Sequence, residues 1–312
     1  MSFNLRRFGA VFHTLWPSLR AESRSGNSKK RLKVTAPVPS LSAPDFEYVL
    51  ETGFLTDMGC VRQRNEDAFT VLSPTNGPTP GRNLLALVAD GMGGHRAGDR
   101  ASRLAVETIG RVFLAATPPV DRRLAEAFQA ANRAIYDEAA DDAALSGMGT
   151  TATALVVSEG AAWLAHVGDS RLYRLHDERL EQLSEDDTLV EGMLKKGLLT
   201  PQEAKFHPER HVLARAMGTH ARLEVMLAPV PLAPGDSYLL CTDGLHDLVD
   251  DEEIRLLLLQ HGPQAACDAL VALARQRGGY DNISVVAVQC GMPDLHTSDA
   301  PPTRDVVQQF HE

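Results

Sequence analysis

The stretch VADGMGGHRAGDRAS, residues 88–102, joins an apolar run to a helical pattern through one acid and a cluster of glycines. The run LLALVA at 84–89 indicates a buried strand, because it is short, apolar and ends at a turn residue. Residues 97–116 form a helical pattern whose apolar side carries Ala101, Leu104, Ala105, Ile109, Val112 and Phe113. The stretch is therefore a strand-to-helix corner with Asp90 at the end of the strand.

Glycine-rich corners of this kind often bind phosphate, but this one lacks both common phosphate-loop patterns. A Walker loop requires Gly-Lys-Ser/Thr after four intervening residues, and residues 91–102 contain no such sequence. A dinucleotide fingerprint starting at Gly91 requires glycine at position 96, where the chain has Arg96. The acid in front of the glycines is therefore the feature that points to function.

Further short apolar or β-branched runs, each bounded by Gly, Asp or Asn, also predict strands. They occupy residues 151–158, 161–168, 237–242 and 283–290. Helical patterns cover 97–116 and 121–140, and a second pair covers 251–260 and 263–277. Strands in clusters and helices in pairs indicate sheets that pack on each other and are flanked by helices, rather than a regular βαβ alternation.

The charge of the 312-residue chain is unevenly distributed. Residues 1–45 carry eight Lys and Arg against two acids, whereas the whole chain has a formal net charge of −10. The acidic balance argues against sequence-independent nucleic-acid binding and suits a protein that binds divalent cations. We expect residues 1–47 to be a basic, disordered tail and linker, 48–291 to be the folded domain, and 292–312 to be a loose tail.

Membrane contact and disulfide bonds are both disfavoured by the sequence. Residues 1–20 contain an apolar helical face that could contact a membrane surface, but Pro17 interrupts it and a disordered tail is favoured. No apolar stretch is long enough to span a bilayer, and no signal peptide is evident. The four cysteines lie far apart, with no CxxC and no zinc spacing, and Cys241 and Cys290 are interpreted as buried small hydrophobes. A reduced, cytoplasmic setting is expected.

Acidic residues recur where predicted strands begin or end, usually beside glycine or asparagine. They are Asp67, Asp90, Asp169, Asp243 and Asp281. Each alone is ordinary turn chemistry, but strand ends converge in space, and converging carboxylates repel one another unless a cation is bound. Oxygen ligands without His or Cys at metal spacing select Mg²⁺ or Mn²⁺. Gly91 would let its backbone carbonyl approach such a cation.

A positively charged group for phosphate is expected beside these acids. Arg62 and Arg64, in DMGCVRQRNED, both lie a few residues before Asp67. A guanidinium suits bidentate phosphate binding, but the spacing alone does not separate the two arginines.

Seven stretches resemble, in order, the motifs of the PP2C (PPM) family of metal-dependent protein serine/threonine phosphatases in its bacterial form. They are TDMGCVRQRNEDAF, VADGMGGHRAGDRAS, GMGTTATALVV, AHVGDSRLYRL, LSEDDTLVEGML, LLCTDGLHDLV and GGYDNISVVAV. They run from about residue 52 to 290 and cover essentially the whole predicted domain. Seven motifs in one order are far more specific than any single one.

The resemblance implies an α+β fold, a four-layer α-β-β-α sandwich with two central antiparallel sheets flanked by helix pairs and a metal site at one end. The implied metal ligands are Glu66, Asp67, Asp90, Gly91, Asp169, Asp243 and Asp281. Asp90 would bridge two Mn²⁺ or Mg²⁺ ions, the Gly91 carbonyl would ligate one, and Asp243 and Asp281 would complete the other. Glu66 and Asp67 would act directly or through waters. A third, weaker ion would lie at Asp169 and Asp243.

The implied activity is hydrolysis of phosphoserine and phosphothreonine in proteins by a water activated between two metals, with Asp90 and Asp243 in catalytic positions. Arg62 matches the phosphate-binding arginine of the family, which selects it over Arg64. The implied protein is a monomer whose substrates are those of a Hanks-type kinase. A catalytically dead relative is disfavoured, because every core acid is present.

Two positions depart from the family. Bacterial relatives usually carry His at the entry to a mobile flap, here residues 185–215, where this chain has Asp187. Eukaryotic members carry a candidate general acid where this chain has Met92. His95 lies nearby, and a structural or capping role is favoured for it.

Overall fold

The computed structural model describes residues 48–73, 83–93, 97–115, 119–158 and 160–292. The strands are β1 (Val49–Asp57), β2 (Asp67–Leu72), β3 (Leu84–Met92), β4 (Gly149–Thr150), β5 (Ala152–Ser158), β6 (Ala161–Val167), β7 (Arg171–His176), β8 (Arg179–Gln182), β9 (Met226–Val230), β10 (Ser237–Cys241) and β11 (Ile283–Gly291). The helices are α1 (Ala97–Ala115), α2 (Val120–Asp141), the 3₁₀ turn η1 (Ala143–Leu145), α3 (Leu189–Lys195), α4 (Pro201–Lys205), α5 (Asp243–His246), α6 (Asp251–Gln260) and α7 (Pro263–Gln276).

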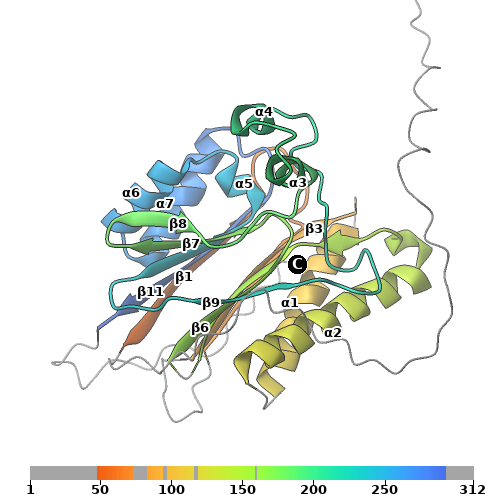
Figure 1. Ribbon diagram of the computed structural model, residues 1–312, viewed down its shortest axis with the longest axis horizontal. Helices are drawn as coiled ribbons and strands as arrows, with labels where there is room; N and C mark the ends of the chain where they lie inside the picture. Colours follow the sequence, from red (N-terminus) through yellow and green to blue (C-terminus); the bar gives the residue numbers. More distant parts are fainter. Residues whose placement is uncertain (1–47, 74–82, 94–96, 116–118, 159, 293–312) are drawn as a thin grey trace, which may run out of the picture. The chain divides into compact units, whose positions relative to one another are not determined.

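Two antiparallel sheets form the centre of the fold. One has the strand order β1-β11-β10-β7-β8, and the other has the order β2-β3-β5-β6-β9 with β4 paired to β3. Helices α1 and α2 cover the second sheet, and α6 and α7 cover the first (Figure 1). The predicted four-layer α-β-β-α sandwich is confirmed.

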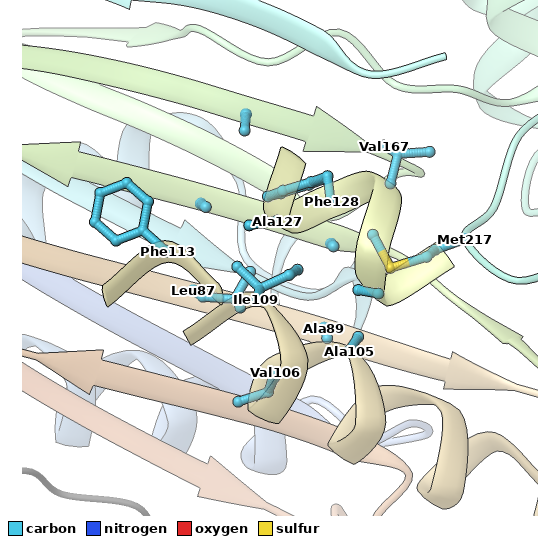
Figure 2. Packing of buried hydrophobic residues seen from close by; sticks show 14 of the residues in the cluster. Leu87, Ala89, Ala105, Val106, Ile109, Phe113, Ala127, Phe128, Val167 and Met217 are labelled. Carbon is cyan, nitrogen blue, oxygen red and sulfur yellow. The ribbon is translucent and has the colours of Figure 1, made fainter. Parts of the chain in front are cut away.

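Strand β3 lies between a helix layer and the opposite sheet, which explains its unbroken apolar run. Leu87 faces the helices, where it belongs to the same buried cluster as Ile109 of α1 and Phe128 of α2 (Figure 2). Val88 faces the other way, into the buried cluster between the two sheets. Both faces of the strand are therefore buried, and this packing fixes the position of Asp90 near the end of the strand.

The strands that sequence patterns missed lie toward the edges of the sheets. β1 is largely half-exposed, so it lacks the continuous apolar run of a central strand. β7 carries Arg171 and Arg174, whose guanidinium groups pair with Asp186 and Asp236. Polar residues with such partners hide the strand signal, because sequence alone does not show the ion pairs.

The described strands run from β1 to β11, within the expected domain of residues 48–291. The expected tail at 1–47, including its apolar face, lies outside the described residues, as does the expected tail at 292–312 apart from Met292. Of the helices that are described, none combines the length and the apolar character needed to cross a bilayer. Cys241 and Cys290 are buried free thiols, as expected from their apolar surroundings in the sequence.

Candidate functional site

A cavity of about 760 Å³ opens at the end of the two sheets that carries the predicted acids. Seven of the predicted site residues line it: Arg62, Glu66, Asp90, Gly91, Asp169, Asp243 and Asp281. They arrive from the loop before β2, the end of β3, the β6–β7 turn, the start of α5 and the turn before β11. Residues far apart in the sequence thus meet at one cavity, because the two sheets stack with these ends together.

Asp67, the eighth predicted residue, lies buried beside this cavity. It is paired with Asp90 in the register of β2 and β3. Its Oδ2 accepts a hydrogen bond of 2.9 Å from the Thr242 hydroxyl, which follows β10. Its Oδ1, like Oδ1 of Asp243, is buried without a hydrogen-bond partner among the described residues. Two buried carboxylate oxygens therefore lack the partner that a folded chain normally supplies.

Burial, together with repulsion between neighbouring carboxylates, raises the pKa values of the acids at this site. Burial, opposed by hydrogen bonds and reinforced by neighbouring carboxylates, raises the pKa of Asp67 to about 7. Burial and the nearby Asp281 raise the pKa of Asp243 to about 7 as well. The pKa values of Asp90 and Asp169 are raised well above the ordinary range, by burial first and by neighbouring acids second. A divalent cation would remove this repulsion, and the all-oxygen donor set fits Mg²⁺ or Mn²⁺.

The structure distinguishes the two candidate arginines. The Arg62 guanidinium lies 2.6 Å from Asp281 Oδ2 at the edge of the cavity, and about half of its side chain is exposed. Arg64 does not line the cavity, and it contributes its backbone carbonyl to a hydrogen bond from Asn282. Of these two arginines, Arg62 is therefore the one placed to meet a phosphate in this cavity.

Asn282 is a positioning residue that the sequence did not reveal. Its Oδ1 accepts the Glu66 amide at 2.8 Å, and its Nδ2 donates to the carbonyls of Met58 and Arg64 at 3.0 and 2.8 Å. These three bonds fasten the loop that carries Arg62 and Glu66 against the turn before β11. The Asp-Asn pair in the sequence indicated only turn chemistry.

The strand-to-helix corner after Asp90 depends on close contact between backbones. A Cβ at Gly91 would lie 2.1 Å from the Gly98 carbonyl oxygen, and the Gly91 amide donates to the Glu66 carbonyl at 3.1 Å. Any side chain at Gly91 would therefore separate α1 from the end of β3. His95 lies outside the described residues.

Sequence reasoning also missed the residues that approach from the flap. Arg210 and His211 line the cavity, as does Asp247 at the end of α5. His211 Nδ1 lies 3.4 Å from Asp247 Oδ2, and ligand atoms of His211, Asp243 and Asp247 all lie within 4.8 Å of one another. Asp247 follows Asp243 by one helical turn, which is a signal that could have been used. The position of His211 depends on how the flap folds back.

Comparison with known proteins identifies the family of the chain. Residues 61–264 match the family described as protein phosphatase 2C. The chain belongs to this family. The predicted family and enzyme class, a metal-dependent phosphoprotein phosphatase, are thereby confirmed.

Relatives of this PP2C chain include named bacterial phosphatases. It is 36% identical over 243 residues to the serine/threonine phosphatase stp of Listeria monocytogenes, a match covering 76% of this chain and 94% of that protein. It is 39% identical over 241 residues to the serine/threonine protein phosphatase PstP of Mycobacterium tuberculosis, covering 76% and 44%. The structure of the catalytic domain of PstP in complex with two manganese ions shares 35% identity, with a TM-score of 0.69 and coverage of 78% and 100%.

The raised pKa values predict how the stability of the metal-free protein depends on pH. Asp67 and Asp243 have folded-state pKa values of about 7 against an ordinary 3.8, so their contribution is present below pH 4 and lost as the pH rises through 7. We expect the thermal midpoint of EDTA-treated protein to fall by more than about 5 °C between pH 5 and 8. Mn²⁺ at pH 8 should reverse the fall, and Asp243→Asn should weaken it. A midpoint that rises or stays level over this range would contradict the assigned shifts.

Proposed function

We propose that this PP2C-family chain hydrolyses phosphoserine and phosphothreonine in proteins, using two Mn²⁺ or Mg²⁺ ions. The observation that carries the proposal is the cluster of buried carboxylates with unpartnered oxygens and the Arg62 guanidinium at its edge. Such a cluster destabilises the fold unless cations occupy it, so its presence is best explained by function. The two manganese ions in the PstP catalytic domain support the same choice of metal and number.

The proposed ligands of the two ions come from the acidic corners. They are the side chains of Glu66, Asp67, Asp90, Asp243 and Asp281 and the carbonyl of Gly91. Asp90 is assigned to both ions, because it lines the cavity and because burial, followed by the charges of Asp67 and Asp243, raises the pKa of its carboxylate. Glu66 and Asp67 are assigned as direct ligands or as acceptors for bound waters.

When bound, the two ions supply an activated water as nucleophile and neutralise charge on the phosphoryl group. Arg62 is proposed to bind the non-bridging phosphate oxygens and to stabilise charge that develops on them. Its half-exposed side chain can reach a substrate at the cavity mouth. With a cation bound beside it, Asp281 would no longer need the Arg62 guanidinium to balance its charge. Arg62 would then be available to bind phosphate.

A third, weaker ion is proposed at Asp169 and Asp243, on the side of the cavity that faces the flap. The His211 imidazole and the Asp247 carboxylate stand close to Asp243 and could serve as additional donors. This side of the site is more open than the Asp67 side, since His211 and Asp247 are exposed. The more open surroundings account for weaker binding.

The proposed substrates are phosphorylated proteins, and the opposing enzyme is proposed to be a Hanks-type kinase. Relatives named serine/threonine phosphatases support the substrate class. We propose that the chain acts as a monomer, because every assigned group comes from one chain.

The test is hydrolysis of a phosphothreonine peptide and of p-nitrophenyl phosphate by the purified full chain. We expect both activities to require Mn²⁺ or Mg²⁺, to disappear with EDTA, to return when metal is restored, and to be indifferent to ATP. Hydrolysis that persists in EDTA, or no hydrolysis with Mn²⁺ present, would refute the proposal.

A further inference from the structure

Asp187, which occupies the flap-entry position where bacterial relatives usually have His, is buried in the structure. Asp187 is only 6% exposed. The carboxylate accepts the Gly168 amide through Oδ2 at 3.2 Å and pairs through Oδ1 with the Arg215 guanidinium. Asp187 therefore joins three segments: the start of the flap, its end, and the turn between β6 and β7.

Backbone bonds bring the two ends of the flap together at this point. The Asp187 amide donates to the Gly168 carbonyl at 2.7 Å, and the Asp187 carbonyl accepts the Ala214 amide at 2.7 Å. The Leu189 amide donates to the Val212 carbonyl at 2.9 Å. We refer to residues 187–189 and 212–215 as the flap neck.

The flap neck is connected to the metal cavity through the β6–β7 turn. Gly168 immediately precedes Asp169, has φ +105°, and leaves no room for a Cβ, which would lie 2.6 Å from the Thr151 side chain. The Thr151 hydroxyl is 2.7 Å from the Ser170 hydroxyl and accepts the Asp90 amide at 2.9 Å. A displacement of the flap neck would therefore shift Asp169 directly, and it would shift Asp90 through Thr151.

The returning arm of the flap also carries cavity residues. Arg210 and His211 line the cavity and precede Arg215 by only a few residues. Their placement depends on where the neck fixes the end of the arm. The entry arm has a second attachment, since the Glu185 carbonyl lies 3.0 Å from Nε2 of the buried His166, so the loss of the Asp187 contact alone should leave the fold intact.

We propose that Asp187 and Arg215 are positioning residues, which hold Asp169, Arg210 and His211 in place for cation and phosphopeptide binding. The inference rests on the proposed function. Neither of the two residues lines the metal cavity.

The test compares Asp187→Asn and Arg215→Gln with Asp236→Asn. Asp236 is also a buried acid paired with an arginine, Arg174. It serves as the control because it precedes β10, whereas Asp243 of the cavity follows the other end of that strand. Mn²⁺ binding would be measured by calorimetry with the metal alone, KM and kcat with a phosphothreonine peptide, and the thermal midpoint by circular dichroism.

Both neck variants are expected to weaken the lowest-affinity Mn²⁺ binding step and to raise the peptide KM by about tenfold or more. The double variant should be no worse than the worse single one, and Arg215→Lys should recover part of the loss. Asp236→Asn should lower the thermal midpoint without changing Mn²⁺ affinity or KM.

Wild-type Mn²⁺ affinity and KM in both neck variants, or equal losses in Asp236→Asn, would overturn the role of the neck while the proposed function stands. A wild-type chain that binds no Mn²⁺ and hydrolyses no phosphopeptide would refute the proposed function and the role of the neck together.

Discussion

Alanine in place of Asp90 or Asp243 is expected to reduce Mn²⁺-dependent hydrolysis of a phosphopeptide by at least about a thousandfold. Metal ions at a phosphoryl group contribute several kcal/mol to the transition state, and each 1.36 kcal/mol corresponds to a factor of ten. Both carboxylates line the cavity, and burial together with neighbouring acids raises the pKa of each. Without either one, the chain should no longer hold the pair of cations.

The same substitutions should stabilise the metal-free protein. Each removes a buried carboxylate that repels its neighbours, so the thermal midpoint in EDTA at pH 8 should equal or exceed that of the wild type. Asp137→Ala is the matched control, because Asp137 pairs with Arg133 on the exposed side of α2 and should lose neither activity nor metal dependence. Near-normal turnover in either Asp90→Ala or Asp243→Ala would refute the metal assignment.

Alanine in place of Arg62 is expected to lower kcat/KM for a phosphopeptide by about a hundredfold. Loss of one preorganised donor to a charged transition state typically costs 10²–10³ in rate. Metal binding should persist, since Arg62 is assigned to the phosphate and not to the cations. A fall in kcat together with kcat/KM would place its contact mainly in the transition state, whereas a rise in KM alone would place it in substrate binding.

Arg64→Ala is the matched control for this prediction. Arg64 is two residues away in the same loop but its side chain does not line the cavity, and its carbonyl, which accepts the Asn282 amide, remains in the variant. We expect less than about a threefold change in kcat/KM. Equal losses in the two variants would remove Arg62 from its assigned role.

The centre of the fold could be predicted from sequence because its strands are buried on both faces. β3, β5 and β6 have long apolar runs that end at glycine or an acid. The bounds of each strand differ from its predicted range by at most a few residues. The edge strand β8 and the adjacent β7 were missed. The ion pairs from Arg171 and Arg174 that accompany β7 exist only in the folded chain.

The candidate site could likewise be predicted from the sequence only in part. Asp90, Asp169, Asp243 and Asp281 stand at strand ends, so their meeting at one cavity follows from sheet stacking. Arg210 and His211 reach it only because the flap neck folds back onto Gly168. The three hydrogen bonds of Asn282 likewise depend on loops more than 200 residues apart in the sequence.

Anomalous diffraction at the manganese edge, from crystals of the full chain grown with Mn²⁺, tests the central claim most directly. We expect two strong peaks in the cavity, both in contact with the Asp90 carboxylate, one of them also in contact with the Gly91 carbonyl and the other with Asp243 and Asp281. A weaker third peak is expected beside Asp169. A cavity without manganese, or with a single ion that does not contact Asp90, would contradict the account.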